Sequence, residues 1–154
     1  MFGLRLAFNL WVRQWIGFNV DVTVTAAEVL PGTGDLYHDA ILGETVTAGQ
    51  VCYILAATSA AWLADADASA AAATIKGVAM NGGAAGQVIR LAIGGEIDPG
   101  FTVTVGQTYV ASGTAGGIAP IADLASNDWV SHLGWGKSAT TLKLDINNTA
   151  VQVP

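Results

Sequence analysis

The nine residues TVTAGQVCY at positions 45–53 return as TVTVGQTYV at positions 102–110, with the same Thr-Val-Thr-x-Gly-Gln core 57 positions later. A chain of 154 residues that carries one phrase twice must accommodate two copies of one local structure. Two copies are too few for a solenoid, which needs about three repeats or more. The repeat therefore predicts a pseudo-symmetric pair of units that closes on itself.

The repetition extends beyond this phrase to four blocks in each unit. The first unit contains GETVTAGQVCYIL, WLADADASAA, IKGVA and QVIRLAI, and the second contains GFTVTVGQTYVAS, GIAPIADLAS, HLGWG and TLKLDI. Matching blocks are offset by 57, about 57, 57 and about 53 positions, so small changes of loop length separate the copies. We expect two units of about 55 residues each, at about 43–97 and 98–150.

The residue types in these blocks favour β-strands. β-branched and aromatic residues flank Gly49-Gln50 and Gly106-Gln107, where a glycine supplies the positive φ that a tight reversal requires. Each phrase is expected to form a short strand, a turn and a returning strand. The block TLKLDI alternates apolar and polar residues, as half-buried strands do. The prediction is an all-β fold, a compact sandwich or squat barrel built from the two units.

The run ADADASAAAA at positions 64–73 is the one stretch of the body with helical composition, and Asp65 or Asp67 could serve as its N-cap. Its short length makes an isolated helix marginal. We therefore expect no more than one helical turn here.

The leading segment differs from the repeated body, and we expect residues 1–30 to form an interaction arm and residues 31–154 the body. From Phe2 to Val24, eleven of the twelve even positions are apolar, which is the period of a strand with one buried face. A second set of apolar residues falls at helical spacing: Leu4, Phe8, Trp11, Trp15, Phe18 and Val22. Strand and helix both stay open, as does a long first strand inside the body's own core.

An aromatic, basic composition of this kind is typical of interfaces. Arg5 and Arg13 interrupt the apolar stretch, which argues against a signal peptide and against a membrane span. The expected interface residues are Phe2, Leu4, Leu6, Phe8, Leu10, Trp11, Arg13, Trp15 and Phe18.

Charge is sparse and unevenly placed. Only 12% of residues are charged, about half the usual share. This indicates a surface that faces another protein. Residues 1–20 carry two arginines and no acid, whereas the rest of the chain has four bases against twelve acids. A body so acidic repels phosphate, so we expect no nucleic-acid partner.

Chemistry-bearing residues do not form a recognisable catalytic set, and we expect neither an enzyme nor a cofactor. His38 lies near Asp35 and Asp39, but no second cluster at ligand spacing supports a metal site, and His132 occupies the place of Ile75 in the first unit. The glycine-rich segments match no phosphate-binding loop. Acids recur at matching places in the two units and are read as turn formers and caps: Asp65, Asp67 and Asp123.

Two further residue types have a structural and a functional interpretation. Cys52 stands alone in an apolar run, which favours a buried, inert thiol and leaves no intrachain disulfide. Trp62, Trp129 and Trp135 could stack on sugars, but packing in the core or at a subunit interface is the favoured interpretation.

The succession of GETVTAGQVCYI, WLADADASAAAATIKGVAMNGGAAGQVIRLAIGG, GQTYVASGTAGGIAP and TTLKL resembles the head decoration, or capsid cement, proteins of tailed bacteriophages. The resemblance covers roughly residues 43–148, and similar wording occurs in phage head-fibre and tail-associated β modules. It implies a small β-rich body, often trimeric, that sits on the capsid surface of the virion and ties neighbouring major capsid protein subunits together.

Three hypotheses follow for function. The leading one is a capsid decoration protein bound through its N-terminal arm, with the major capsid protein and further copies of itself as partners and no membrane. The second is a receptor- or glycan-binding module of a phage head fibre or tail, with exposed tryptophans on sugar faces. A small hydrolase is the third, and it lacks the residues for the chemistry.

Overall fold

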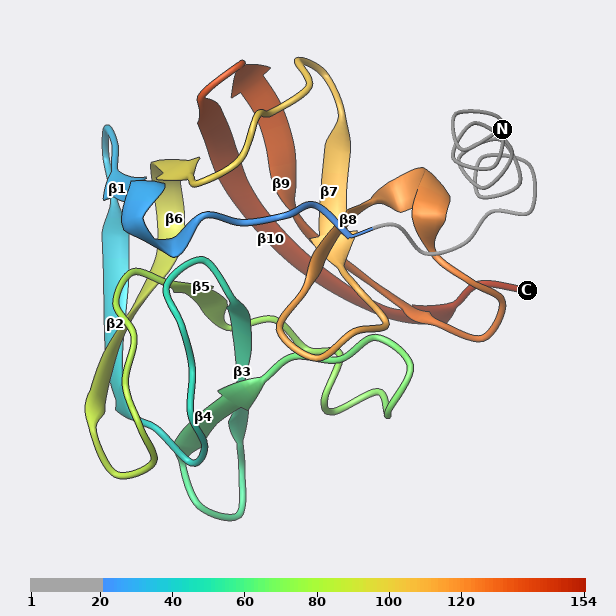
Figure 1. The fold of residues 1–154 in the computed structure, drawn as a ribbon. Helices are drawn as coiled ribbons and strands as arrows, with labels where there is room; N and C mark the ends of the chain where they lie inside the picture. The colour runs from blue at the N-terminus through green and yellow to red at the C-terminus, as the bar shows by residue number, and fades with distance from the viewer. Residues whose placement is uncertain (1–20) are drawn as a thin grey trace, which may run out of the picture.

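The computed structural model describes residues 21–154 of the chain and confirms the all-β prediction. Ten antiparallel strands form one curled sheet, a half-barrel (Figure 1). In chain order they are β1 (Val29–Pro31), β2 (Leu36–Ile41), β3 (Val51–Leu55), β4 (Ala60–Leu63), β5 (Gly77–Ala79), β6 (Val88–Pro99), β7 (Thr108–Ala111), β8 (Ile118–Pro120), β9 (Trp129–Ser138) and β10 (Thr141–Gln152). Two 3-10 helices are short: η1 (Ala26–Glu28) and η2 (Ile121–Asp123).

The strand order is the same when it is traced outward from the centre of the sheet in either direction. The path runs β4-β3-β5-β6-β10-β9-β7-β8, so β3, β4, β5 and β6 correspond to β7, β8, β9 and β10. The two sets meet at the antiparallel β6–β10 pair, where Ile97 lies opposite Leu142. Outside this path, β1 and β2 both pair with β6.

The register in which the strands pair is repeated as well as the strand order. Cys52 pairs with Leu63 between β3 and β4, and Tyr109 pairs with Pro120 between β7 and β8, each partner 57 positions later. The β3–β5 and β7–β9 pairs show the same shift. Two copies of one phrase therefore lie in equivalent places of one sheet.

The last block shows a shorter offset than the sequence comparison gives. Leu91 of β6 lies opposite Ala79, and Leu142 of β10 lies opposite Gly136. Leu91 and Leu142 are thus equivalent at an offset of 51 positions, not about 53. The difference arises because the long connection before β6 is replaced by a tight one before β10.

Both repeated phrases turn at their glycine, as predicted. Gly49 and Gly106 have φ values of 89° and 79°, and their N–H groups donate to the carbonyls of Ala79 and Gly136 at 2.7 and 2.8 Å. The strand expected before each turn is not formed. In the first copy only Val46 makes an isolated bridge.

The run at 64–73 forms turns and no helix longer than one turn, as expected, with the Ala73 N–H donating to Ser69 O at 2.9 Å. The backbone of this segment bonds to the other unit: Ala66 N–H donates to Ser112 O at 2.8 Å and Trp129 N–H donates to Ala66 O at 2.7 Å. A residue bonded in this way to distant segments cannot complete a helical ladder, so tertiary contacts override the alanine-rich composition.

Two hydrophobic clusters lie against the sheet. The larger joins both units through residues such as Val51, Ile97, Tyr109, Leu133 and Leu142, all of them buried. The smaller belongs to the first unit and includes Leu42, Cys52, Ile89 and Leu91. Residues 21–28, which we call the strap, run across the molecule from β8 to β1 (Figure 1), and Val22 and Val24 pack on the larger cluster.

Candidate interaction surface

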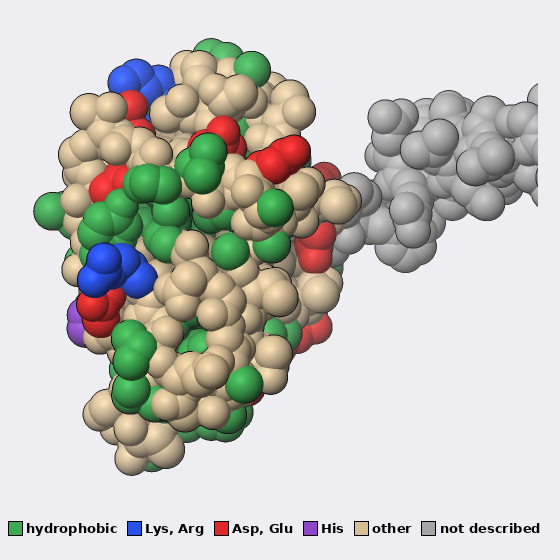
Figure 2. Space-filling view, turned by 60° about the vertical axis from the view of Figure 1, so that its left-hand side comes forward, with side chains coloured by type: hydrophobic (Ala, Val, Ile, Leu, Met, Phe, Trp, Pro, Cys, Tyr) green, Lys and Arg blue, Asp and Glu red, His purple; other side chains and the backbone are tan. Residues whose placement is uncertain are grey.

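Exposed apolar side chains gather on the outer face of β2 and the start of β6. The pairing of β2 with β6 places Tyr37, Asp39 and Ile41 opposite Ala92, Arg90 and Val88, so one face carries two charged and several apolar side chains. Figure 2, which brings this side forward, shows hydrophobic side chains on either side of a basic and acidic pair. The β2 patch consists of Leu36, Tyr37, Asp39, Ile41, Val88 and Arg90.

The apolar members of the β2 patch are open to solvent. Leu36 is 62% exposed, Tyr37 40%, Ile41 49% and Val88 60%. Adjacent exposed apolar side chains on a small domain mark interaction sites more often than isolated ones do.

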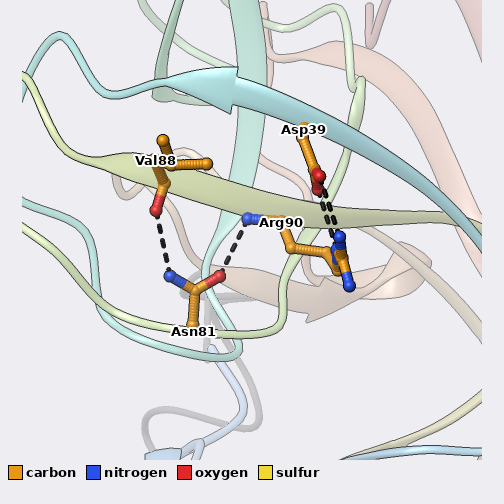
Figure 3. Close-up of polar contacts among 4 residues, drawn as sticks. All are labelled: Asp39, Asn81, Val88 and Arg90. Atoms are coloured by element: carbon orange, nitrogen blue, oxygen red, sulfur yellow. Dashed lines mark hydrogen bonds and ion pairs between the residues drawn. The ribbon is translucent and has the colours of Figure 1, made fainter.

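At the centre of the patch, Arg90 and Asp39 form a bidentate ion pair. The Nε–Oδ1 and Nη2–Oδ2 distances are both 2.8 Å (Figure 3). The hydrogen bond from Arg90 lowers the pKa of the Asp39 carboxyl. The Arg90 guanidinium carbon also lies 5.5 Å from the centre of the Tyr37 ring. A guanidinium that is hydrogen-bonded to a carboxylate and also lies over an aromatic ring is held in one position.

Asn81 fixes the other side of Arg90. Its Oδ1 accepts the Arg90 N–H at 2.8 Å, and its Nδ2 donates to Val88 O at 3.2 Å (Figure 3). The amide thereby pairs with β6 as a strand residue would. Together with Met80 and Asp39, these residues line an open hollow of about 360 Å³.

Asp35 holds the start of β2. Its carboxylate accepts hydrogen bonds from Gly32 N–H at 2.8 Å, Glu96 N–H at 3.2 Å and the Tyr37 hydroxyl at 2.8 Å. The bond to Asp35 raises the pKa of Tyr37. These contacts make Asp35 a residue that stabilises the turn before β2. Its position near His38 in the sequence did not reveal this role.

The strap is held on the body by hydrogen bonds along its length. Val22 N–H donates to Ile118 O at 2.8 Å, and Thr25 N–H donates to Gly100 O at 2.7 Å. The Ser112 hydroxyl donates to Asp21. Both ends of the strap are therefore bonded to the body.

Glycines on the body make room for the strap. A Cβ on Gly49 would lie 2.3 Å from Val24 Cγ1, and one on Gly117 would lie 2.6 Å from Asp21 Oδ2. With contacts this short, a side chain at either position would require the side chain of Val24 or Asp21 to move.

The remaining sequence candidates have structural roles or stay separate. In residues 21–154 no group of three or more metal-ligating side chains comes together, so His38, Asp35 and Asp39 do not form such a cluster. His132 is half-buried on β9. Asp65 Oδ1 accepts the Asp67 N–H at 3.2 Å in a turn.

Burial raises the pKa of two of these carboxyls. It is the largest cause for Asp65 and for Asp123, with the nearby Asp21 adding to the effect at Asp123. Both side chains lie in turns or short helical segments, as expected of turn formers.

Cys52 is buried and free, as expected, and burial raises the pKa of its thiol to about 12.

Among the tryptophans, Trp62 and Trp129 are half-buried and Trp135 is 43% exposed. Within the part of the chain that the structure describes, no helix is long and apolar enough to cross a bilayer.

The arm residues predicted as the interface lie outside the described residues, whereas the β2 patch was not predicted. Its signal is present in the sequence in part, because VIRL alternates exposed and buried positions and YHDAI alternates exposed and half-buried ones. Their pairing joins residues about 50 positions apart, which a local pattern does not specify.

A comparison with protein-family models finds none that matches the chain, and a comparison with curated proteins finds no match either.

Proposed function

We propose that this chain is a structural virion protein that binds the outer surface of a tailed-phage capsid and stabilises the contacts between major capsid protein subunits. The proposal starts from the resemblance of residues 43–148 to capsid decoration proteins, and the compact β body agrees with it. Residues 1–20 supply the principal contact, and the body acts as the rigid part to which they are joined.

The observation that supports this division most directly is the anchored strap. A segment that transmits force between a capsid and a bound body must be held where it enters that body. Backbone bonds at Val22 and Thr25 and the close fit against Gly49 and Gly117 meet this requirement. A load on the arm would then pass into the larger hydrophobic cluster instead of peeling away a loose end.

The proposed mechanism is mechanical and thermodynamic. A protein that binds the assembled lattice but not its separated subunits shifts the equilibrium toward the lattice. At a free concentration about 100 times its Kd, one site contributes about 2.7 kcal/mol. Many sites on one shell would add such contributions, without any chemical step.

Deletion of residues 1–20 tests the proposed contact. The truncated chain is expected to keep its β circular dichroism and its urea transition, because the strap remains, and to lose co-sedimentation with purified heads. In the full chain, Trp11→Ala with Trp15→Ala should weaken co-sedimentation, while Val105→Ala, at an exposed apolar site, should not. Equal decoration of heads by the truncated and full chains would exclude the arm as the contact.

A second candidate function, glycan binding by a fibre or tail module, is favoured by the exposed ring of Trp135. Saturable binding to a glycan that Trp135→Ala removes, with heads left undecorated, would select this function over the first.

A further inference from the structure

The β2 patch is an apolar surface on one face of the β2–β6 pair (Figure 2). The edge of β2 is less open than this face, because Leu42 forms a bridge to Ala61 of β4 and the Gly43 N–H donates to Ala61 O at 2.9 Å. Of the nine large apolar side chains exposed in residues 21–154, four belong to the patch: Leu36, Tyr37, Ile41 and Val88. The face, and not the edge, is therefore the surface open to a partner.

The charges of the patch cancel, which sets it apart from the rest of the body. Residues 21–154 carry four bases and twelve acids. Within the patch, Arg90 and Asp39 supply one charge of each sign. Two copies of so acidic a body repel each other across most of their surfaces, and a basic partner is drawn to the acidic surfaces first. A second neutral patch meets this one without net repulsion.

The ion pair at the centre of the patch has capacity for a second pair. Two of the five side-chain N–H donors of Arg90 bind Asp39, and no other residue of the described part of the chain accepts from the remaining three. Each Asp39 oxygen accepts one of these bonds and has a further lone pair. The two side chains are 57% and 48% exposed, so a second copy can reach both. The pair is thus self-complementary.

We propose that the β2 patch binds the β2 patch of a second copy of the chain in an isologous contact, in which Asp39 of each copy pairs with Arg90 of the other. A twofold axis along the strands produces this arrangement, because Asp39 and Arg90 lie directly opposite each other on β2 and β6. The same rotation places Ile41 of one copy over Val88 of the other, apolar on apolar.

The size of the patch predicts a weak dimer. A standard interface takes about 20–30 residues from each partner, and the β2 patch has six. We expect a Kd between about 10 μM and 1 mM. The contact requires no capsid, so its failure and the failure of the proposed function are separate results.

Sedimentation equilibrium of the full chain, up to about 1 mM, measures this association, and charge reversal identifies the surface. Asp39→Arg gives each patch two cations and Arg90→Asp gives it two acids, so each variant alone should associate at least about tenfold more weakly than the natural chain. An equal mixture of the two variants should form a heterodimer about as strong as the natural dimer, because two cations then face two acids. Urea unfolding checks that each variant is folded.

Val105 supplies the matched controls, since it is 67% exposed and lies in the connection between β6 and β7, away from β2 (Figure 1). Val105→Arg and Val105→Asp should leave self-association unchanged. A mixture of Asp39→Arg with Val105→Asp should not restore the dimer, which excludes general attraction between opposite charges.

Three results would overturn the proposal. One is a natural chain that stays monomeric, as it would if its own residues 1–20 or a different protein covered the patch. Another is a natural dimer that neither single reversal weakens. The third is a mixture of Asp39→Arg and Arg90→Asp that associates no better than either variant alone.

Discussion

Gly49 and Gly106 occupy equivalent positions in the two copies of the repeated phrase and have similar backbone angles, yet their surroundings differ. A Cβ on Gly49 would meet Val24 of the strap, whereas nothing lies within 4 Å of a Cβ on Gly106. The repeat thus separates two reasons for a glycine, its backbone conformation and its lack of volume. Of these two glycines, only Gly49 lies against the strap.

Substitution of these two glycines by alanine should show the difference. Gly106→Ala is expected to lower the free energy of unfolding by about 1 kcal/mol, the cost of a left-handed backbone for an L-residue. Gly49→Ala should lower it by about 1–3 kcal/mol more, because the packed side chain of Val24 must move. Urea unfolding of both variants measures this, and equal losses would show that the strap does not press on Gly49.

Cys52 provides a prediction on pH. Burial raises the pKa of its thiol to about 12 in the folded state, against about 8.5 in an unfolded chain. Between these values the unfolded chain loses a proton that the folded chain keeps, so stability falls as pH rises. The stabilising contribution is complete below about pH 8.5 and is lost as pH approaches 12.

The Cys52→Ala variant lacks this pH dependence and therefore serves as the reference for the natural chain. The difference in unfolding free energy between the natural chain and Cys52→Ala should shrink by about 2 kcal/mol from pH 7.5 to pH 10. Urea unfolding with a reductant present, at both pH values, gives the two differences. An unchanged difference would mean that the thiol ionises as readily in the folded state.

At the scale of elements, the sequence predicts most where the signal is local. Alternating residues in TLKLDI form part of β10, and the two glycines turn the chain, because a short window contains the whole cause. The segment at 64–73 forms no helix longer than one turn, because Ala66 bonds to Ser112 and Trp129, residues far along the chain. The β2 patch was not predicted for the same reason, since its ion pair joins Asp39 to Arg90, which is distant in the sequence.

One side chain joins the connection before β5 to β10. Asn148 Oδ1 accepts the Ile75 N–H at 2.7 Å, and its Nδ2 donates to Ile75 O at 3.0 Å. Asn148→Ala leaves both backbone groups of a buried residue without these partners, so we expect a loss of about 1–3 kcal/mol. The neighbouring Asn147→Ala should change stability by less than about 0.5 kcal/mol.

Amide hydrogen exchange would locate the effect of Asn148→Ala. The Ile75 amide should exchange faster in that variant, while the amides of the β7–β8 pair keep their protection. A loss of stability without any change at Ile75 would assign the role of Asn148 to another contact.

At the scale of the whole molecule, the proposed capsid contact and the β body are separate parts of the chain. Residues 1–20 would contact the capsid, and the strap, bonded to the body at Val22 and Thr25, would join them to it.

The most direct measurement of the proposed function is the thermal stability of phage heads purified without this protein. Calorimetry with the full chain added in excess should raise the temperature at which the shell disrupts, and addition of the chain without residues 1–20 should not. An unchanged temperature with the full chain, or the same increase with the truncated chain, would contradict capsid stabilisation through the arm.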